Sequence, residues 1–286
     1  MKKYFKIIIG LLFITSFTFA FKMPSIYPWN ANLSGYYTFG DYSNGSIYSS
    51  QAVYFSMDRR LKERFIVAFE QMKIKTNGAP DYIQYNVLAR DMFWIKPYLQ
   101  IGGMFGKITS PTLDHGWIVG AQISGNTKWF GYGFSTTQSD YDSHISHEGG
   151  VSDYFYPDSL DYYTDFIVYQ KDYSILRSIK NHTFQFLYST QDIEENSHAF
   201  YSAFWTYTPH DYFVITAGYG QGESRFSVNP YSLLINNNPS LLENFYSLKN
   251  SLRVHTNWTI NLVYSLHNYE NSLNIEYYAI GIQGRF

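Results

Sequence analysis

The densest group of residues able to do chemistry lies near the middle of the chain, where His144, Ser146, His147 and Glu148 fall within five positions. A serine becomes a nucleophile when a base is within hydrogen-bond reach and a third group orients that base. The residue types for such a triad are present. They stand, however, in the longest stretch without alternating hydrophobicity, which places them on a loop. We therefore expect a solvated loop and no enzymatic activity.

A second group of polar residues around the same stretch is acidic. No basic residue occurs between Lys128 and Lys171. The members that we expect at an outer acidic loop are Asp140, Asp142, Glu148, Asp153 and Asp158. An acidic loop at the outer opening of a channel concentrates cations and offers carboxylates to Ca²⁺ or Mg²⁺. Because the spacing matches no calcium-loop pattern, we predict a solvated loop with no metal and no cofactor.

The composition indicates the environment of these residues. Aromatic residues make up 20% of the chain and charged residues only 15%, against about 25% charged in ordinary soluble domains. The mean hydropathy is nevertheless −0.27, and no run of about 18 apolar residues follows the N-terminal region. This combination is typical of strands with one face in lipid and one face in water. A net charge of −2 without basic clusters argues against a nucleic-acid partner, and the absence of Cys excludes disulfides and thiolate metal sites.

The first twenty residues have the pattern of a targeting segment. Lys2, Lys3 and Lys6 precede an apolar stretch, and Ala20 ends a plausible cleavage site. The alternative, an uncleaved anchor helix, is disfavoured because the apolar run is shorter than a bilayer span. We predict a signal peptide over residues 1–20 and a single β-barrel domain over residues 21–286.

After residue 20 the chain consists of short segments with apolar residues at every second position. In residues 82–90, Ile83, Tyr85 and Val87 share one face, while Gln84 and Asn86 share the other. Strands are expected near residues 31–40, 47–57, 62–75, 81–91, 97–107, 115–125, 128–138, 161–172, 181–191, 197–207, 211–222, 247–256, 258–268 and 273–286. The prediction is an all-β, antiparallel, up-and-down transmembrane barrel of about fourteen strands. Twelve or sixteen remain possible, because Tyr231 to Ile235 could be a strand fragment.

The connections between these strands alternate in length. The two longest, 139–160 and 223–246, follow the seventh and eleventh strands and therefore fall on the same side. Tight turns near 59–61, 126–127, 208–210 and 257 fall on the other side, as periplasmic turns do in such barrels. Both termini are accordingly expected in the periplasm.

The last strand carries the most specific pattern. Tyr278, Ile280, Ile282 and Phe286 project to one face, and Gln283 and Arg285 to the other. This resembles the C-terminal strand of bacterial outer-membrane β-barrel proteins, which ends in an aromatic residue. The resemblance covers about nine residues and implies that these residues are an assembly signal for the barrel-assembly machinery. It also implies lipid and lipopolysaccharide as surroundings, and leaves the oligomeric state open.

The opposite faces of the strands are expected to line the lumen. The lumen-lining candidates are Arg64, Glu70, Gln84, Arg90, Gln100, Gln122, Arg253, His267 and Arg285. This set is mixed in charge and forms no ring of one sign, which a strongly selective pore would show. Either long loop could fold inward. Glycines on the central strands fit either strand curvature, which we favour, or a bulky inner element close to the wall.

Three functions remain. Size, even strand count and the lack of room for a plug before the first strand favour a porin-like channel for passive passage of small hydrophilic solutes. Total length and Tyr-rich strands are similar to YaiO-like barrels, which implies a role in polysaccharide export as the alternative. An outer-membrane lipid hydrolase is the second alternative, but the His-x-Ser run lacks the Asn-Gly that follows it in barrel lipases. His210-Asp211 reverses the Asp-His order of omptin-like proteases.

Overall fold

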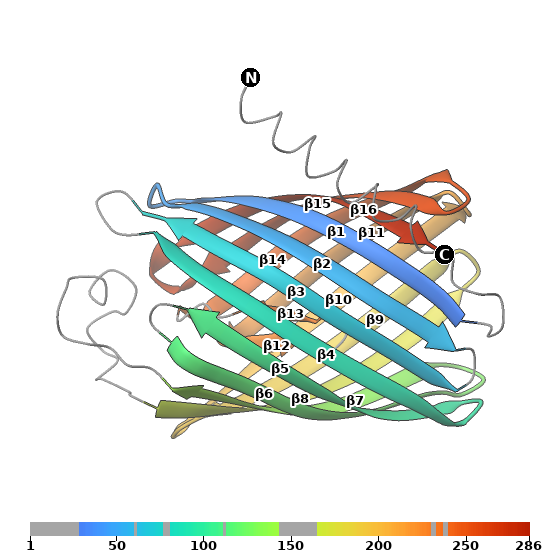
Figure 1. Cartoon of the computed structure of the whole chain (residues 1–286), viewed down its shortest axis with the longest axis horizontal. Coiled ribbons are helices and arrows are strands. Elements are labelled where there is room, and N and C mark those ends of the chain that lie inside the picture. The colour runs from blue at the N-terminus through green and yellow to red at the C-terminus, as the bar shows by residue number, and fades with distance from the viewer. Residues whose placement is uncertain are drawn as a thin grey trace.

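The structure, a computed structural model, describes residues 29–59, 62–76, 81–110, 113–142, 165–229, 233–236 and 240–286. Fourteen strands close into one antiparallel barrel (Figure 1), which confirms the predicted architecture and strand number. The wall strands are β1 (Trp29–Tyr42), β2 (Ile47–Arg59), β3 (Glu63–Lys75), β4 (Tyr82–Lys96), β5 (Leu99–Ser110), β6 (Leu113–Asn126), β7 (Gly131–Asp142), β8 (Asp165–Ile179), β9 (His182–Ile193), β10 (Asn196–His210), β11 (Phe213–Ser224), β14 (Leu242–His255), β15 (Trp258–Tyr269) and β16 (Asn274–Arg285).

Neighbours in the barrel are neighbours in sequence, apart from two places. β11 pairs with β14, and β1 pairs with β16 to close the barrel, with Tyr36 opposite Gly281. Closure leaves no edge strand, so every wall strand has a partner on both sides. Among the described residues, no helix is long and apolar enough to cross a bilayer.

Period-two alternation separates the two faces of the wall. On β4, Tyr85 and Val87 are exposed on the outer face, while Gln84, Asn86 and Leu88 are buried inside. Large apolar and aromatic side chains stay exposed around the whole outer face, as on β3 and β6. Such a continuous apolar exterior is stable in lipid rather than in water.

Turns at one end of the barrel are tight, and the long connections lie at the other. We call these the termini end, where β1 begins and β16 ends, and the loop end (Figure 1). Residues 143–164 follow β7 and residues 225–241 follow β11, so both long connections leave the loop end. This arrangement agrees with the alternation expected from the sequence.

The segment that left twelve or sixteen strands possible does form strands, but not in the wall. β12 (Ser227–Asn229) and β13 (Leu234–Asn236) pair only with each other. They form a hairpin inside the barrel, because their apolar side chains pack against lumen-facing residues of the wall (Figure 1). The fragment was ambiguous because a short apolar run fits a wall strand and an inner hairpin equally well.

Lumen-facing glycines accommodate large side chains of neighbouring strands. A Cβ on Gly220 would lie 2.3 Å from the Phe245 ring, and one on Gly106 would lie 2.3 Å from a methyl group of Leu88. Gly281 faces the ring of Tyr36 in the same way. The favoured curvature interpretation is therefore incomplete, because these glycines also provide room for a filled interior.

Candidate functional site in the barrel lumen

The strand register determines which face each candidate occupies. Tyr36, Ala52, Glu70 and Asn86 stand opposite one another on successive strands, and the alternation continues around the barrel. By this register, the nine lumen-lining candidates face inward: Arg64, Glu70, Gln84, Arg90, Gln100, Gln122, Arg253, His267 and Arg285. They do not form one site. Gln84, Arg90 and Gln122 are buried, whereas Arg253 and Arg285 are exposed.

The inner hairpin fills the loop-end half of the lumen with apolar side chains. Phe226, Val228, Leu233 and Ile235 are buried. They share one cluster with lumen-facing residues of β3 to β8, namely Ala68, Leu88, Met104, Ile108, Ile118, Tyr141 and Val168. The Phe226 ring lies 5.6 Å from that of Tyr141, measured between centroids. Burial of this kind contributes about 1.5–3 kcal/mol per large side chain and keeps the hairpin against the wall.

Side-chain amides of the wall bind the hairpin backbone. The Gln170 Nε2 group donates to the Val228 carbonyl at 2.7 Å, and the Val228 N–H donates to Gln170 Oε1 at 3.1 Å. Gln191 donates to Gln170 Oε1 and accepts from the Arg225 N–H at 3.0 Å. We call Gln170 and Gln191 the amide clamp. Both are nearly inaccessible, with exposed fractions of 4% and 1%.

A buried carboxylate orients the amide clamp. Asp172 accepts from Gln170 Nε2 at 2.8 Å and from the Ser135 hydroxyl at 3.1 Å. These contacts fix which way the Gln170 amide points, so that its two polar atoms match the donor and acceptor of Val228. Because every polar atom of Gln170 is used, pulling the hairpin away would leave buried groups unsatisfied.

A second polar network crosses β3 and β4. Gln84 donates to Asn86 at 2.7 Å, and Asn86 donates to Glu70 at 3.0 Å. Tyr82 donates to Gln84 at 2.8 Å and extends the chain toward the loop end. Glu70 therefore lies inside the barrel with its charge held by hydrogen bonds rather than open to a passing ion.

The opposite part of the loop-end lumen is aromatic. Phe200, Leu242, Tyr269 and Ile275 form a buried cluster. The His267 ring lies against it, 4.9 Å from the Tyr277 ring centroid. His267 is thus enclosed by rings and placed away from the other lumen candidates.

The termini-end half of the lumen is polar. Arg64 pairs with Asp58 at 2.6 Å, and Gln100 accepts from Ser124 at 3.2 Å. Arg253 and Arg285 lie near the ends of β14 and β16, exposed to the solvent of the lumen mouth. This half therefore carries charged groups that are exposed to solvent.

Most of the acidic loop falls outside the described residues. Glu148, Asp153 and Asp158 lie there, as does the Ser146 run. Asp140 stands on the outer face of β7, opposite Trp117. Asp142 belongs to β7 through its backbone. In the described part of the chain, no three His, Cys, Asp or Glu residues gather as a metal site.

One carboxylate at the loop-end rim has a shifted pKa. Asp81 precedes β4 and lies 2.5 Å from the Lys73 ammonium. The hydrogen bond from Lys73 lowers the pKa of the Asp81 carboxyl below its usual value. The negative charge of this rim carboxylate is therefore compensated by the Lys73 ammonium group.

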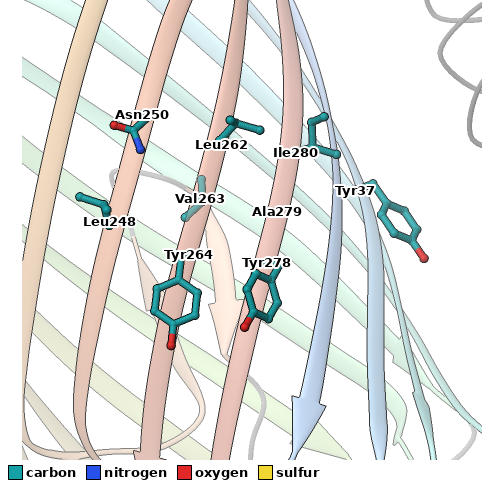
Figure 2. A pocket seen from close by; sticks show the side chains of 9 residues that line it. All are labelled: Tyr37, Leu248, Asn250, Leu262, Val263, Tyr264, Tyr278, Ala279 and Ile280. Carbon is teal, nitrogen blue, oxygen red and sulfur yellow. The ribbon is translucent and has the colours of Figure 1, made fainter.

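The proposed assembly residues lie on the outer face of β16. Tyr278 and Ile280 stand beside Tyr264 and Leu262 of β15, and the Tyr264 and Tyr278 rings are 5.2 Å apart (Figure 2). With Tyr37 of β1 these residues line a shallow apolar groove on the exterior (Figure 2). Ile282 and Phe286 continue the same face toward the termini end.

The amide clamp was not predicted from the sequence. Gln170, Asp172 and Ser174 alternate along β8 and are buried together with Gln191. The alternation of Gln170 and Asp172 was visible in the strand expected near residues 161–172, but these residues were not among the lumen-lining candidates. Their partner, the hairpin backbone, has no side-chain pattern that would reveal the contact.

Comparison with known proteins shows the fold. The structure matches the CymD monoaromatic hydrocarbon channel with a TM-score of 0.58 and 10% identity, over 91% of this chain and 89% of that one. It matches the toluene transporter TbuX of Ralstonia pickettii with a TM-score of 0.54 and 9% identity, over 90% of this chain and 89% of that one. It also matches the outer-membrane protein Omp33 of Acinetobacter baumannii with a TM-score of 0.50 and 9% identity, over 90% of this chain and 98% of that one. No family model and no curated protein matches the sequence.

The chain therefore has the fold of the bacterial outer-membrane β-barrel proteins. At sequence identities near 10%, the likeness shows the architecture of the barrel but does not show which solute it handles. The role of the lumen has to be argued from its own residues.

Proposed function

We propose that the protein is an outer-membrane channel for passive passage of small hydrophilic solutes, closed at rest by its inner hairpin. The observation that carries this proposal is the division of the lumen. A polar, charged half at the termini end meets a half filled by the hairpin at the loop end. The proposed role is non-enzymatic. We also propose that both termini lie in the periplasm.

Closure depends on contacts that can be broken without unfolding the wall. Among the described residues, the hairpin makes no strand pair with the barrel, so its release would leave all fourteen wall pairings intact. The clamp and the apolar cluster hold it through side chains of the wall. A channel of this design opens when the hairpin leaves the wall.

The test is single-channel recording of the refolded protein in planar bilayers. Replacing residues 226–236 with a short Gly-Ser linker should convert a mostly silent barrel into one with stable unitary conductance. The matched control replaces Glu194 and Glu195, the turn between β9 and β10 at the same end, and should stay mostly silent. Silence of the hairpin-replaced barrel at several voltages would contradict the channel proposal.

One observation favours a second solute class. Leu88, Met104 and Ile118 make the loop-end wall apolar, and Phe200 and Phe245 line its other side. Small aromatic compounds would fit this lining once the hairpin moved. Two assays distinguish the candidates: toluene uptake by cells with and without the protein, and sugar passage through liposomes that contain it. Higher toluene uptake with the protein supports the aromatic candidate. Unchanged toluene uptake together with sugar passage supports the hydrophilic candidate.

A further inference from the structure

The inward-facing acidic and basic side chains of the lumen differ in whether they have partners within the protein. By sequence alone, the candidates were mixed in sign. Among the described side chains, however, the inward carboxylates have partners inside the protein. Asp58 pairs with Arg64, Glu70 accepts from Asn86, and Asp172 accepts from Ser135 and Gln170. These negative charges are compensated or enclosed.

Three inward cations differ from these carboxylates. Lys249, Arg253 and Arg285 form no ion pair with any described residue. Lys249 stands opposite Thr216 and Val263, Arg253 opposite Thr259. No acidic side chain directly faces either cation across its neighbouring strands.

The three cations lie on one side of the lumen. Arg253 pairs with Thr259, which pairs with Gln283, the next inward neighbour of Arg285 on β16. Two interstrand spacings separate β14 from β16, about 10 Å. Lys249 lies four residues from Arg253 along β14, about 13 Å deeper toward the loop end. A solute entering from the termini end therefore meets two guanidinium groups and then an ammonium group.

We infer that Lys249, Arg253 and Arg285 form a binding track for small anions, carboxylates or phosphates, and that the open channel prefers these solutes. Guanidinium groups bind carboxylate and phosphate oxygens through paired hydrogen bonds, and an ammonium group adds a point charge. A wall of one sign raises the local concentration of the opposite ion. The inference rests on the proposed channel and specifies its solutes.

The permeability ratio of the hairpin-replaced channel tests the preference. In a tenfold KCl gradient, chloride should permeate at least about threefold better than potassium. Combining Lys249→Gln, Arg253→Gln and Arg285→Gln should bring the ratio to about one or below. The control combines Lys107→Gln, Lys171→Gln and Arg177→Gln, which removes the same charge from the outer face and should leave the ratio unchanged.

Equilibrium binding separates this inference from the channel itself. The refolded wild-type barrel in detergent should bind inorganic phosphate by calorimetry, and the lumen triple variant should lose at least about tenfold in affinity. If the barrel is silent but binds phosphate through these residues, the channel proposal fails and the anion track stands. An open channel that prefers potassium, or phosphate binding unaffected by the lumen substitutions, overturns the track.

Discussion

The two halves of the lumen use polar residues in opposite ways. At the loop end, Gln170, Gln191 and Asp172 are buried and bind one another and the hairpin backbone. At the termini end, Arg253 and Arg285 are exposed and form no ion pair with any described residue. Polar residues that face a lumen therefore do not by themselves make a pore. What matters is whether the protein has already satisfied those groups.

Breaking the clamp is expected to have the largest effect. Gln170→Ala removes two hydrogen bonds to Val228 and leaves its buried N–H and carbonyl without that partner. At about 1 kcal/mol per bond, the closed state loses about 2 kcal/mol, or ~30-fold in the opening equilibrium. Recordings should show that increase in open probability. Gln138→Ala, on the outer face of β7, serves as control; equal effects would remove the clamp from the account.

A second effect, on the stability of the barrel, is expected where a glycine makes room for the loop-end rings. A Cβ on Gly220 would lie 2.3 Å from Phe245 and 2.5 Å from Phe200, whereas the nearest atom to a Cβ on Gly103 is 3.5 Å away. Gly220→Ala should therefore lower the free energy of unfolding by about 1–3 kcal/mol, as overpacking does. Gly103→Ala should change it little. Thermal unfolding in detergent measures both, and equal Tm values would contradict a tightly filled loop-end half.

The smallest effect is expected at the termini-end ion pair. Arg64 and Asp58 are 46% and 28% exposed, and such pairs contribute about 0.2–1 kcal/mol to stability. Arg64→Gln should leave Tm nearly unchanged. Because it uncovers the Asp58 carboxylate, it should lower the anion-to-cation permeability ratio by less than about twofold. A large loss of stability would show that this half is also held by packed polar contacts.

Much of the wall was predictable because its signal is local. Alternation along β4 and β15 reveals strand and face together, and a one-residue error in register would expose every inward residue to lipid. The same alternation placed Gln84 and Arg253 on the inner face. β7 extended beyond its expected range to Asp142 because its polar end resembles a turn in sequence, and β8 ran beyond residue 172 to Ile179.

The hairpin and the charge balance were not predictable in this way. Both depend on contacts between residues far apart in the chain, such as Gln170 with Val228. A count of charges treats Asp58 and Arg253 alike, although only the first is paired. The glycines were informative, yet the signal of Gly220 was read as curvature because the aromatic side chains that fill its space lie on other strands.

The most direct test tethers the hairpin to the wall. The chain has no cysteine, so Tyr141→Cys with Phe226→Cys, whose native rings lie 5.6 Å apart between centroids, gives one defined pair for a short cleavable cross-linker. In the Gln170→Ala background, which is expected to raise the open probability, single-channel recording should show a silent barrel while the link is intact and openings after reduction. Unitary conductance that is the same with the link intact and after its cleavage would contradict closure by the hairpin.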